Sequence, residues 1–125
     1  MILLGAMLTG CQMQKGSGES VGRPVIQQIV VTTQQGIKNF TNEEKMQEIL
    51  HKIRRLGQKF TPEVDPESLP GTVVSVELLR SDGTRVVYAI KNDRFVRQGS
   101  QPWQQGESRR ILALRLLLEE LPADG

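Results

Sequence analysis

The sequence predicts a single α+β domain with the element order β-α-β-β-β-α, in which a four-stranded, mainly antiparallel sheet carries two helices on one face. Three observations support this fold class. Segments rich in β-branched residues alternate with two segments whose apolar residues recur at helical spacing, and an Asp-Gly pair separates two of the β-rich segments. The 125 residues also suffice for one modest core but not for two. We therefore expect residues 23–125 to form one globular domain.

The first strand and the first helix are predicted between residues 25 and 57. Residues 25–33 are rich in β-branched side chains without helical spacing, which favours a strand, and the following QQGIKNF is expected to turn the chain toward a helix. Thr41 and Glu44 have the T-x-x-E spacing of a capping box, and Gly57 is a residue type that commonly ends a helix. The apolar stripe of this helix comprises Met46, Ile49, Leu50, Ile53 and Leu56.

A long loop and a hairpin follow. Residues 58–71 contain three prolines and no sustained periodicity, which predicts a loop of a length that is sometimes functional. Residues 72–90 indicate a hairpin around Asp82-Gly83. A three-residue turn with Gly83 in the left-handed position places the apolar residues of both strands on one face, whereas a two-residue turn scatters them over both faces. The favoured register pairs Leu78 with Val86, Val76 with Tyr88 and Val74 with Ile90.

The rest of the chain predicts a short strand at residues 94–98 and a closing helix. Residues 107–122 are helical by composition, and Pro122 ends the helix. Leu112 and Leu116 lie on the side of this helix that faces away from the core, so we name them as a possible interface. The core-facing stripe comprises Ile111, Leu114, Leu117, Leu118 and Leu121.

The N-terminal run MILLGAMLTG is apolar but too short to cross a bilayer as a helix, which needs about 20 residues. Its length fits the apolar part of a secretory signal, with small residues before a cleavage site. The tetrapeptide Leu8-Thr9-Gly10-Cys11 resembles the lipobox of bacterial lipoproteins. The resemblance implies that Cys11, the only cysteine, is lipidated with a diacylglyceryl group and becomes the mature N-terminus once the signal peptide at residues 1–10 is removed.

The residues after Cys11 fit a domain that is anchored to a membrane. The segment QMQKGSGESVG is polar and rich in Gly and Ser, as flexible tethers are. We expect residues 11–22 to join the lipid anchor to the domain, on the extracytoplasmic face of the cell membrane. No Lys or Arg precedes the apolar run, so we expect a translation start upstream of Met1, or a fragment. The alternative is a frayed end or a first strand, with Cys11 as a small buried side chain.

Composition excludes several kinds of chemistry. A single cysteine excludes an internal disulfide and zinc sites built from several cysteines. The formal net charge is +2 and the basic residues are scattered, so we expect no nucleic-acid partner. The only histidine, His51, lies away from the apolar stripe of its helix, and no G-x-S-x-G motif accompanies it. We expect no catalytic centre, no metal and no cofactor.

Acidic residues alternate along the proline-bearing loop, at Glu63, Asp65 and Glu67. This spacing can gather oxygen ligands for a cation, but the central glycine of a calcium-binding loop is missing. An exposed linker explains the pattern better. The same carboxylates would serve an enzyme only if two of them converged in a cleft.

Basic residues cluster along the predicted meander, and the only tryptophan follows closely. Such a group suits an anionic polymer, a glycan or lipid headgroups. The alternative is solubilising charge that is partly paired with nearby carboxylates, with the tryptophan as a plug over the end of the core. The possible binding surface comprises Arg80, Arg85, Arg94, Arg97 and Trp103.

Together these features predict a membrane-anchored extracytoplasmic lipoprotein whose domain is a non-catalytic binding module for an envelope protein or an anionic polymer. Two alternatives remain. A small envelope enzyme would use the loop carboxylates, with arginines holding an anionic substrate. A cytoplasmic homodimer would associate through Leu112 and Leu116.

Overall fold

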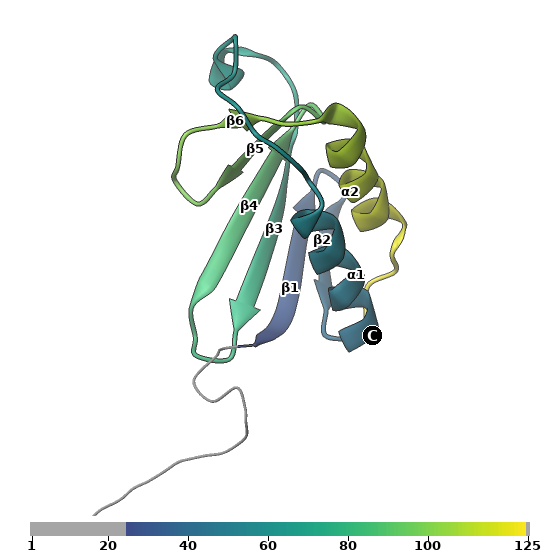
Figure 1. Ribbon diagram of the computed structural model, residues 1–125. Coiled ribbons are helices and arrows are strands. Elements are labelled where there is room, and N and C mark those ends of the chain that lie inside the picture. The colour runs from purple at the N-terminus through teal and green to yellow at the C-terminus, as the bar shows by residue number, and fades with distance from the viewer. Residues whose placement is uncertain (1–24, 125) are drawn as a thin grey trace, which may run out of the picture.

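The structure, a computed structural model, describes residues 25–124 and is α+β, with two helices and an antiparallel sheet (Figure 1). The strand order in the sheet is β2-β1-β3-β4-β5-β6. The helices are α1 (Glu43–Arg54) and α2 (Ser108–Glu120), and a short 3₁₀ helix, η1 (Pro66–Ser68), lies in the long loop. The strands are β1 (Ile26–Thr33), β2 (Gly36–Phe40), β3 (Val73–Arg80), β4 (Arg85–Lys91), β5 (Phe95–Gln98) and β6 (Gln104–Gln105).

The sheet therefore has six strands, and the prediction of four is wrong. The two additional strands, β2 and β6, are the edges of the sheet, and neither carries the alternation of apolar and polar residues that marks a half-buried strand. In β2, the residues opposite Val31 and Ile29 of β1 are Lys38 and Phe40, so one of its core-side positions holds a charged residue. β6 consists of two glutamines. The segment expected to turn toward the helix thus forms a strand first.

The predicted register of the β3–β4 hairpin is confirmed. Leu78 lies opposite Val86, Val76 opposite Tyr88, and Val74 opposite Ile90. Residues 81–83 form the turn, in which the Arg80 amide donates to the Thr84 carbonyl at 2.9 Å and the Gly83 amide donates to the Arg80 carbonyl at 3.0 Å. Gly83 has a φ of 87°, the left-handed conformation that the three-residue turn requires.

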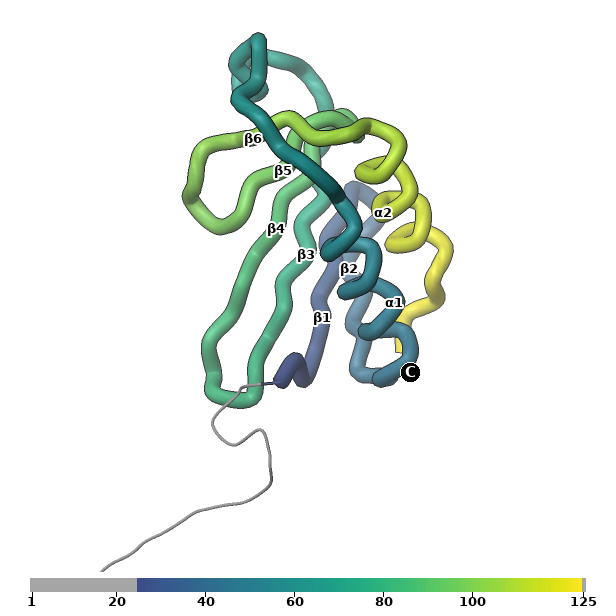
Figure 2. Tube along the Cα trace, in the orientation of Figure 1, coloured from purple at the N-terminus to yellow at the C-terminus, as the bar shows by residue number. Residues whose placement is uncertain are grey.

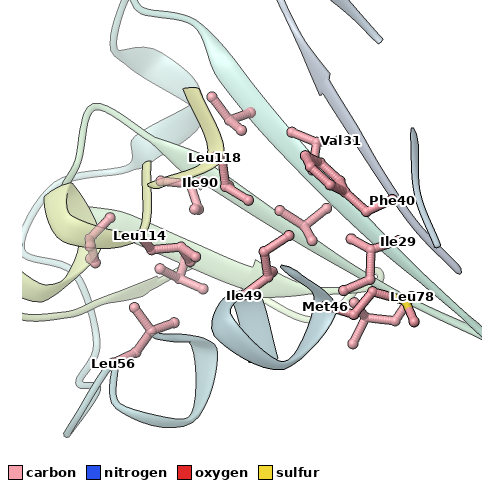
Figure 3. Close-up of a cluster of buried hydrophobic side chains, with 14 residues drawn as sticks. Ile29, Val31, Phe40, Met46, Ile49, Leu56, Leu78, Ile90, Leu114 and Leu118 are labelled. Carbon is pink, nitrogen blue, oxygen red and sulfur yellow. The ribbon is translucent and has the colours of Figure 1, made fainter. Parts of the chain in front are cut away.

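Both helices pack on one face of the sheet, and the main hydrophobic core lies between the two layers (Figures 1 and 3). Both predicted helical stripes contribute to this core, which confirms the helical spacing. Tyr88 and Val86 border the core and are half-buried. The buried members are Ile29, Val31, Phe40, Met46, Ile49, Leu56, Val74, Val76, Leu78, Ile90, Val96, Ile111, Leu114 and Leu118.

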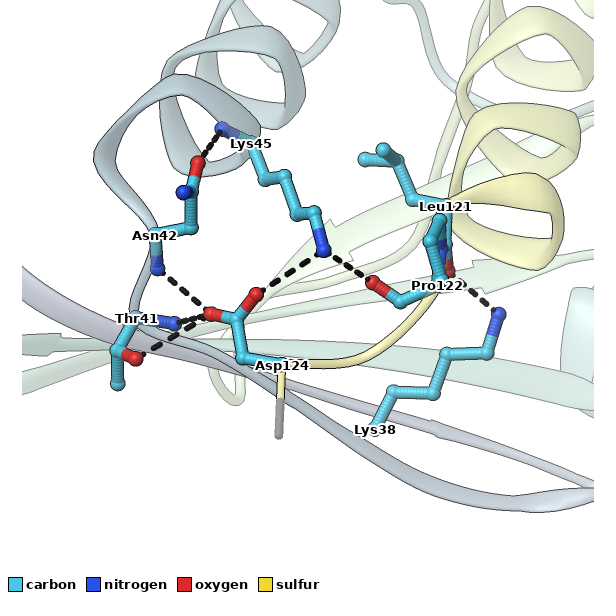
Figure 4. Close-up of polar contacts among 7 residues, drawn as sticks. All are labelled: Lys38, Thr41, Asn42, Lys45, Leu121, Pro122 and Asp124. Atoms are coloured by element: carbon cyan, nitrogen blue, oxygen red, sulfur yellow. Dashed lines mark hydrogen bonds and ion pairs between the residues drawn. The ribbon is translucent and has the colours of Figure 1, made fainter.

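The start of α1 differs from the predicted capping box. Asn42, not Thr41, is the N-cap, and its side-chain oxygen accepts a hydrogen bond from the Lys45 amide at 3.0 Å. The amide and hydroxyl groups of Thr41 instead donate to the Asp124 carboxylate near the C-terminus (Figure 4). The T-x-x-E pattern therefore marks the helix start within two residues but identifies the wrong cap.

The C-terminal end of α2 is capped by a strand residue, Lys38. Its ammonium group donates to the carbonyls of Leu118, Glu119 and Leu121 at 3.1, 2.7 and 2.9 Å. The last carbonyls of a helix lack partners within the helix and carry partial negative charge, so a lysine here is doubly favourable. This contact explains why β2 places a charged residue on the core side of the sheet.

Leu112 and Leu116 lie on the outer side of α2, as predicted. Their exposed fractions are 36% and 40%, whereas Ile111, Leu114 and Leu118 are fully buried. Their role as an interface remains a prediction.

Candidate functional site

The five residues predicted to form a binding surface are separated in the structure. Arg80 and Arg85 flank the β3–β4 turn, and Arg85 forms a 2.8 Å ion pair with Glu77, one of the carboxylates expected to neutralise these arginines. Arg97 faces Ala89, four residues along β4 from Arg85, which corresponds to about 13 Å.

Arg97 and Trp103 do come together. The Arg97 guanidinium carbon lies 4.9 Å from the centre of the Trp103 ring, in cation–π geometry. The indole Nε1 of Trp103 donates to the Glu67 carboxylate at 2.6 Å. Trp103 is only 8% exposed, so packing and a charge-assisted hydrogen bond fix the ring on which Arg97 stacks. Arg94 makes a separate stack, 5.0 Å from the Phe95 ring.

A hollow of about 480 Å³ opens beside this stack, between the long loop and the β5–β6 connection, and we call it the loop hollow. Its walls combine apolar surface with charges of both signs. Arg97 and Trp103 lie on one side, and loop residues form the other. The lining comprises Thr61, Pro62, Glu63, Val64, Asp65, Pro66, Arg97, Ser100, Gln101, Pro102 and Trp103.

The long loop is held over the end of the sheet by backbone and side-chain contacts (Figure 2). Phe60 and Gln105 exchange two backbone hydrogen bonds at 2.9 and 2.8 Å, which ties the loop to β6. The Lys91 ammonium group donates to the Pro66 carbonyl at 2.7 Å, and the side-chain Nδ2 of Asn92 donates to the Pro70 carbonyl at 3.1 Å. These contacts give the loop hollow a defined wall.

Gly71 ends the loop, and the contact between Asn92 and the loop requires a glycine at this position. Its φ is 142°, and a Cβ atom there would lie 1.9 Å from the Asn92 side-chain oxygen. Any residue larger than glycine would therefore displace Asn92 from the loop.

A second buried cluster lies under the loop, on the sheet face opposite the helices. Lys91 pairs with Phe95 across β4 and β5, while their neighbours Ile90 and Val96 belong to the main core. Because side chains alternate along a strand, Lys91 and Phe95 point to the other face. Both are buried, as is Trp103. The tryptophan is thus buried, but it packs in this second cluster and does not cover the end of the main core as predicted.

The sequence contained one signal for this second cluster. Apolar residues occupy the outward positions of β3 and β4 at Leu79, Val87 and Ala89, so the outer face is not purely polar. The position of the loop over this cluster could not be predicted from the sequence. Its contacts join Pro66 to Lys91 and Glu67 to Trp103, which are 25 and 36 positions apart.

Two of the three loop carboxylates are engaged in holding the structure. Glu67 accepts from Trp103, and Asp65 accepts the Glu67 amide at 3.0 Å as the N-cap of η1. Glu63 lines the loop hollow. Within residues 25–124, no group of three or more His, Cys, Asp or Glu side chains is placed to hold a metal ion. His51 is exposed on α1, as predicted.

Cys11 and the rest of the predicted signal and tether lie outside the described residues. Between residues 25 and 124, neither helix is long and apolar enough to span a bilayer. Comparison of the chain with protein-family models, with curated proteins and with solved structures found no match.

Proposed function

We propose that the protein is a lipoprotein anchored to the extracytoplasmic face of the cell membrane, and that its domain binds another envelope protein through the loop hollow without catalysing a reaction. The anchor is proposed from Leu8-Thr9-Gly10-Cys11 and the polar tether that follows. Two acyl chains and a third on the amine bury many CH₂ groups, at about 0.8 kcal/mol each, so anchoring needs no membrane-spanning segment.

The observation that carries the binding proposal is the lining of the loop hollow. Proline, valine and tryptophan supply apolar surface with few rotatable bonds, and Arg97 adds a stacked cation. Tryptophan and arginine are the residues most enriched at energetically dominant positions of protein interfaces. Glu63 places a carboxylate on the opposite wall, so the hollow fits a segment with apolar and charged side chains better than a purely anionic polymer.

An enzyme that uses the loop carboxylates is the weaker candidate. Catalysis by a pair of carboxylates requires both to be available to a substrate in one cleft. Here Glu67 holds the indole of Trp103 and Asp65 caps η1, which leaves Glu63 as the remaining member of the loop trio.

The anchor is tested by labelling cells with radioactive palmitate. We expect the full-length protein to incorporate label, and processing to be blocked by globomycin. Cys11→Ala should abolish both label and membrane association. An unlabelled wild-type protein, or a Cys11→Ala variant with unchanged mobility and solubility, would contradict the anchor.

The binding site is tested with a photo-crosslinking amino acid at Val64, which lines the loop hollow and is 42% exposed. In the anchored, full-length protein we expect one discrete protein adduct, and none from the same probe at the exposed Glu120 of α2. Arg97→Gln should lower the yield about fivefold, the effect of losing ~1 kcal/mol from a cation–π contact at the site. Equal adducts from both positions, or a yield that is insensitive to Arg97→Gln, would rule out the loop hollow as the binding site.

A further inference from the structure

A second hollow of about 270 Å³ lies on the helix side of the Gln101-Pro102 segment, between the end of α1 and strands β4 to β6. We call it the cationic cavity. Two exposed basic residues line it, Arg54 of α1 and Lys59 of the long loop, and Arg97 of β5 lies in the wall that it shares with the loop hollow. Its volume suits a small group rather than a drug-sized ligand, for which pockets begin at about 300 Å³.

The charge around this cavity is uncompensated. Its lining contains no Asp or Glu. Among residues 25–124, the ion pairs engage Lys45, Arg85, Arg110 and Arg115, and none involves Arg54, Lys59 or Arg97. Arg54 and Lys59 line one cavity and repel each other, and an anion bound between them would relieve that repulsion.

The other polar groups of the cavity can donate hydrogen bonds. Gln98, Gln101 and Gln104 each bring a carboxamide to the lining. The guanidinium group of Arg97 is not one of these donors, because it stacks on Trp103 at 4.9 Å on the sheet face opposite the helices. The charged donors available to the cavity are therefore Arg54 and Lys59.

We propose that the cationic cavity binds the phosphate group of a phosphate ester. The oxygens of a phosphate ester are arranged tetrahedrally and can accept from donors on several sides of the cavity, whereas the two oxygens of a carboxylate lie in one plane. Ile53, Leu56 and Val96 line the same cavity and supply apolar surface for the carbon part of the ester. The cavity shares Arg97, Gln101 and Pro102 with the loop hollow, but the proposal depends neither on the lipid anchor nor on a protein partner.

The proposal is tested by nuclear magnetic resonance on the ¹⁵N-labelled full chain carrying Cys11→Ser, titrated with inorganic phosphate. We expect saturable shifts of the Gln98, Gln101 and Gln104 resonances. The double variant Arg54→Gln/Lys59→Gln should bind phosphate at least about tenfold more weakly, since each lost charge-assisted hydrogen bond carries roughly one factor of ten or more. Both residues sit at exposed positions, so the variant should keep its fold.

Arg55→Gln/Arg109→Gln is the matched control. It removes the same charge from exposed positions that do not line the cavity, so binding should change by less than about twofold, as expected for screened charges. Shifts without saturation, or equal losses in both double variants, would overturn the site. Displacement of phosphate by acetate as readily as by glycerol 1-phosphate would overturn the assignment to phosphate esters.

The phosphate group could belong to a lipid headgroup or to a soluble or polymeric phosphate ester, and a vesicle-binding experiment with the same protein distinguishes the two. Retention by phosphatidylglycerol vesicles over phosphatidylcholine vesicles, lost in Arg54→Gln/Lys59→Gln, supports a lipid headgroup. Binding of soluble glycerol 1-phosphate without retention on vesicles supports a soluble or polymeric phosphate ester. Neither result depends on the crosslinking at Val64, so the cationic cavity and the loop hollow are tested independently.

Discussion

At the scale of single residues, Asp124 joins the C-terminal segment to the start of α1. Its carboxylate accepts hydrogen bonds from the amides of Thr41 and Asn42, the latter at 2.6 Å, and pairs with Lys45 at 3.1 Å. The two backbone hydrogen bonds, assisted by Lys45, lower the pKa of Asp124 from 3.8 to about 2. A residue near the C-terminus thus supplies the acceptor that the helix start lacks.

This shift predicts how stability depends on pH. Because the folded pKa lies below the unfolded value of 3.8, the contribution of Asp124 is present above that value and is lost as the pH falls through about 2. Asp124→Asn keeps the shape of the side chain but removes its charge. We expect the variant to be less stable than the wild type in urea denaturation near neutral pH, with the difference shrinking as the pH approaches 2. Glu120→Gln, at an exposed position, is the control, and a difference that does not vary with pH would contradict the account.

The helix-capping roles of Asp124 and Lys38 could not be predicted from the sequence. Lys38 caps α2 across 80 positions, and Asp124 caps α1 across 82. Local capping does leave a spacing pattern, and that pattern predicted the start of α1 within two residues although it identified Thr41 in place of Asn42. Partners brought together only by the tertiary fold leave no local pattern.

At the scale of elements, the β3–β4 hairpin could be predicted in full because two independent constraints agree. Turn chemistry favours a glycine in the left-handed position, and the facing pattern of apolar residues admits one register. The edge strands β2 and β6 were not predicted. An edge strand is paired on one side only, and these two bury few apolar residues, so they lack the apolar pattern of a strand.

The turn glycine gives a direct test of the first constraint. A Cβ atom at Gly83 would meet nothing within 4 Å, so a substitution there changes backbone conformation alone. We expect Gly83→Ala to lower the free energy of unfolding by about 1 kcal/mol, since a φ of 87° is unfavourable for an L-residue. Gly83→Asn should lose less, because asparagine tolerates this conformation. Urea denaturation measures both, and equal losses would point to a cause other than the left-handed backbone.

At the scale of the whole molecule, the described chain begins at one end of the sheet, and the long loop that lines the loop hollow lies at the other end (Figure 1). Val25 is bound to the β3–β4 turn, where the Ser81 amide donates to its carbonyl at 2.8 Å and the Ser81 hydroxyl accepts from its amide at 3.1 Å. The eight residues of β3 between that turn and the loop end span about 25 Å. If a lipid is attached through the proposed flexible tether, its attachment point is at the β3–β4 end of the sheet, so that end would on average lie nearer the membrane than the loop hollow.

Trp103, the only tryptophan, allows this arrangement to be measured. In vesicles of brominated phosphatidylcholine, bromine quenches only those indoles that approach the bilayer. We expect the lipidated protein to keep the Trp103 emission that it shows in vesicles without bromine. In a Trp103→Phe background, Thr84→Trp places the indole at an exposed position beside the β3–β4 turn, and its emission should fall because that turn adjoins the start of the domain. Quenching of Trp103 as strong as that of Thr84→Trp would mean that the loop hollow faces the lipid, and the proposed binding of a protein partner there would then have to be abandoned.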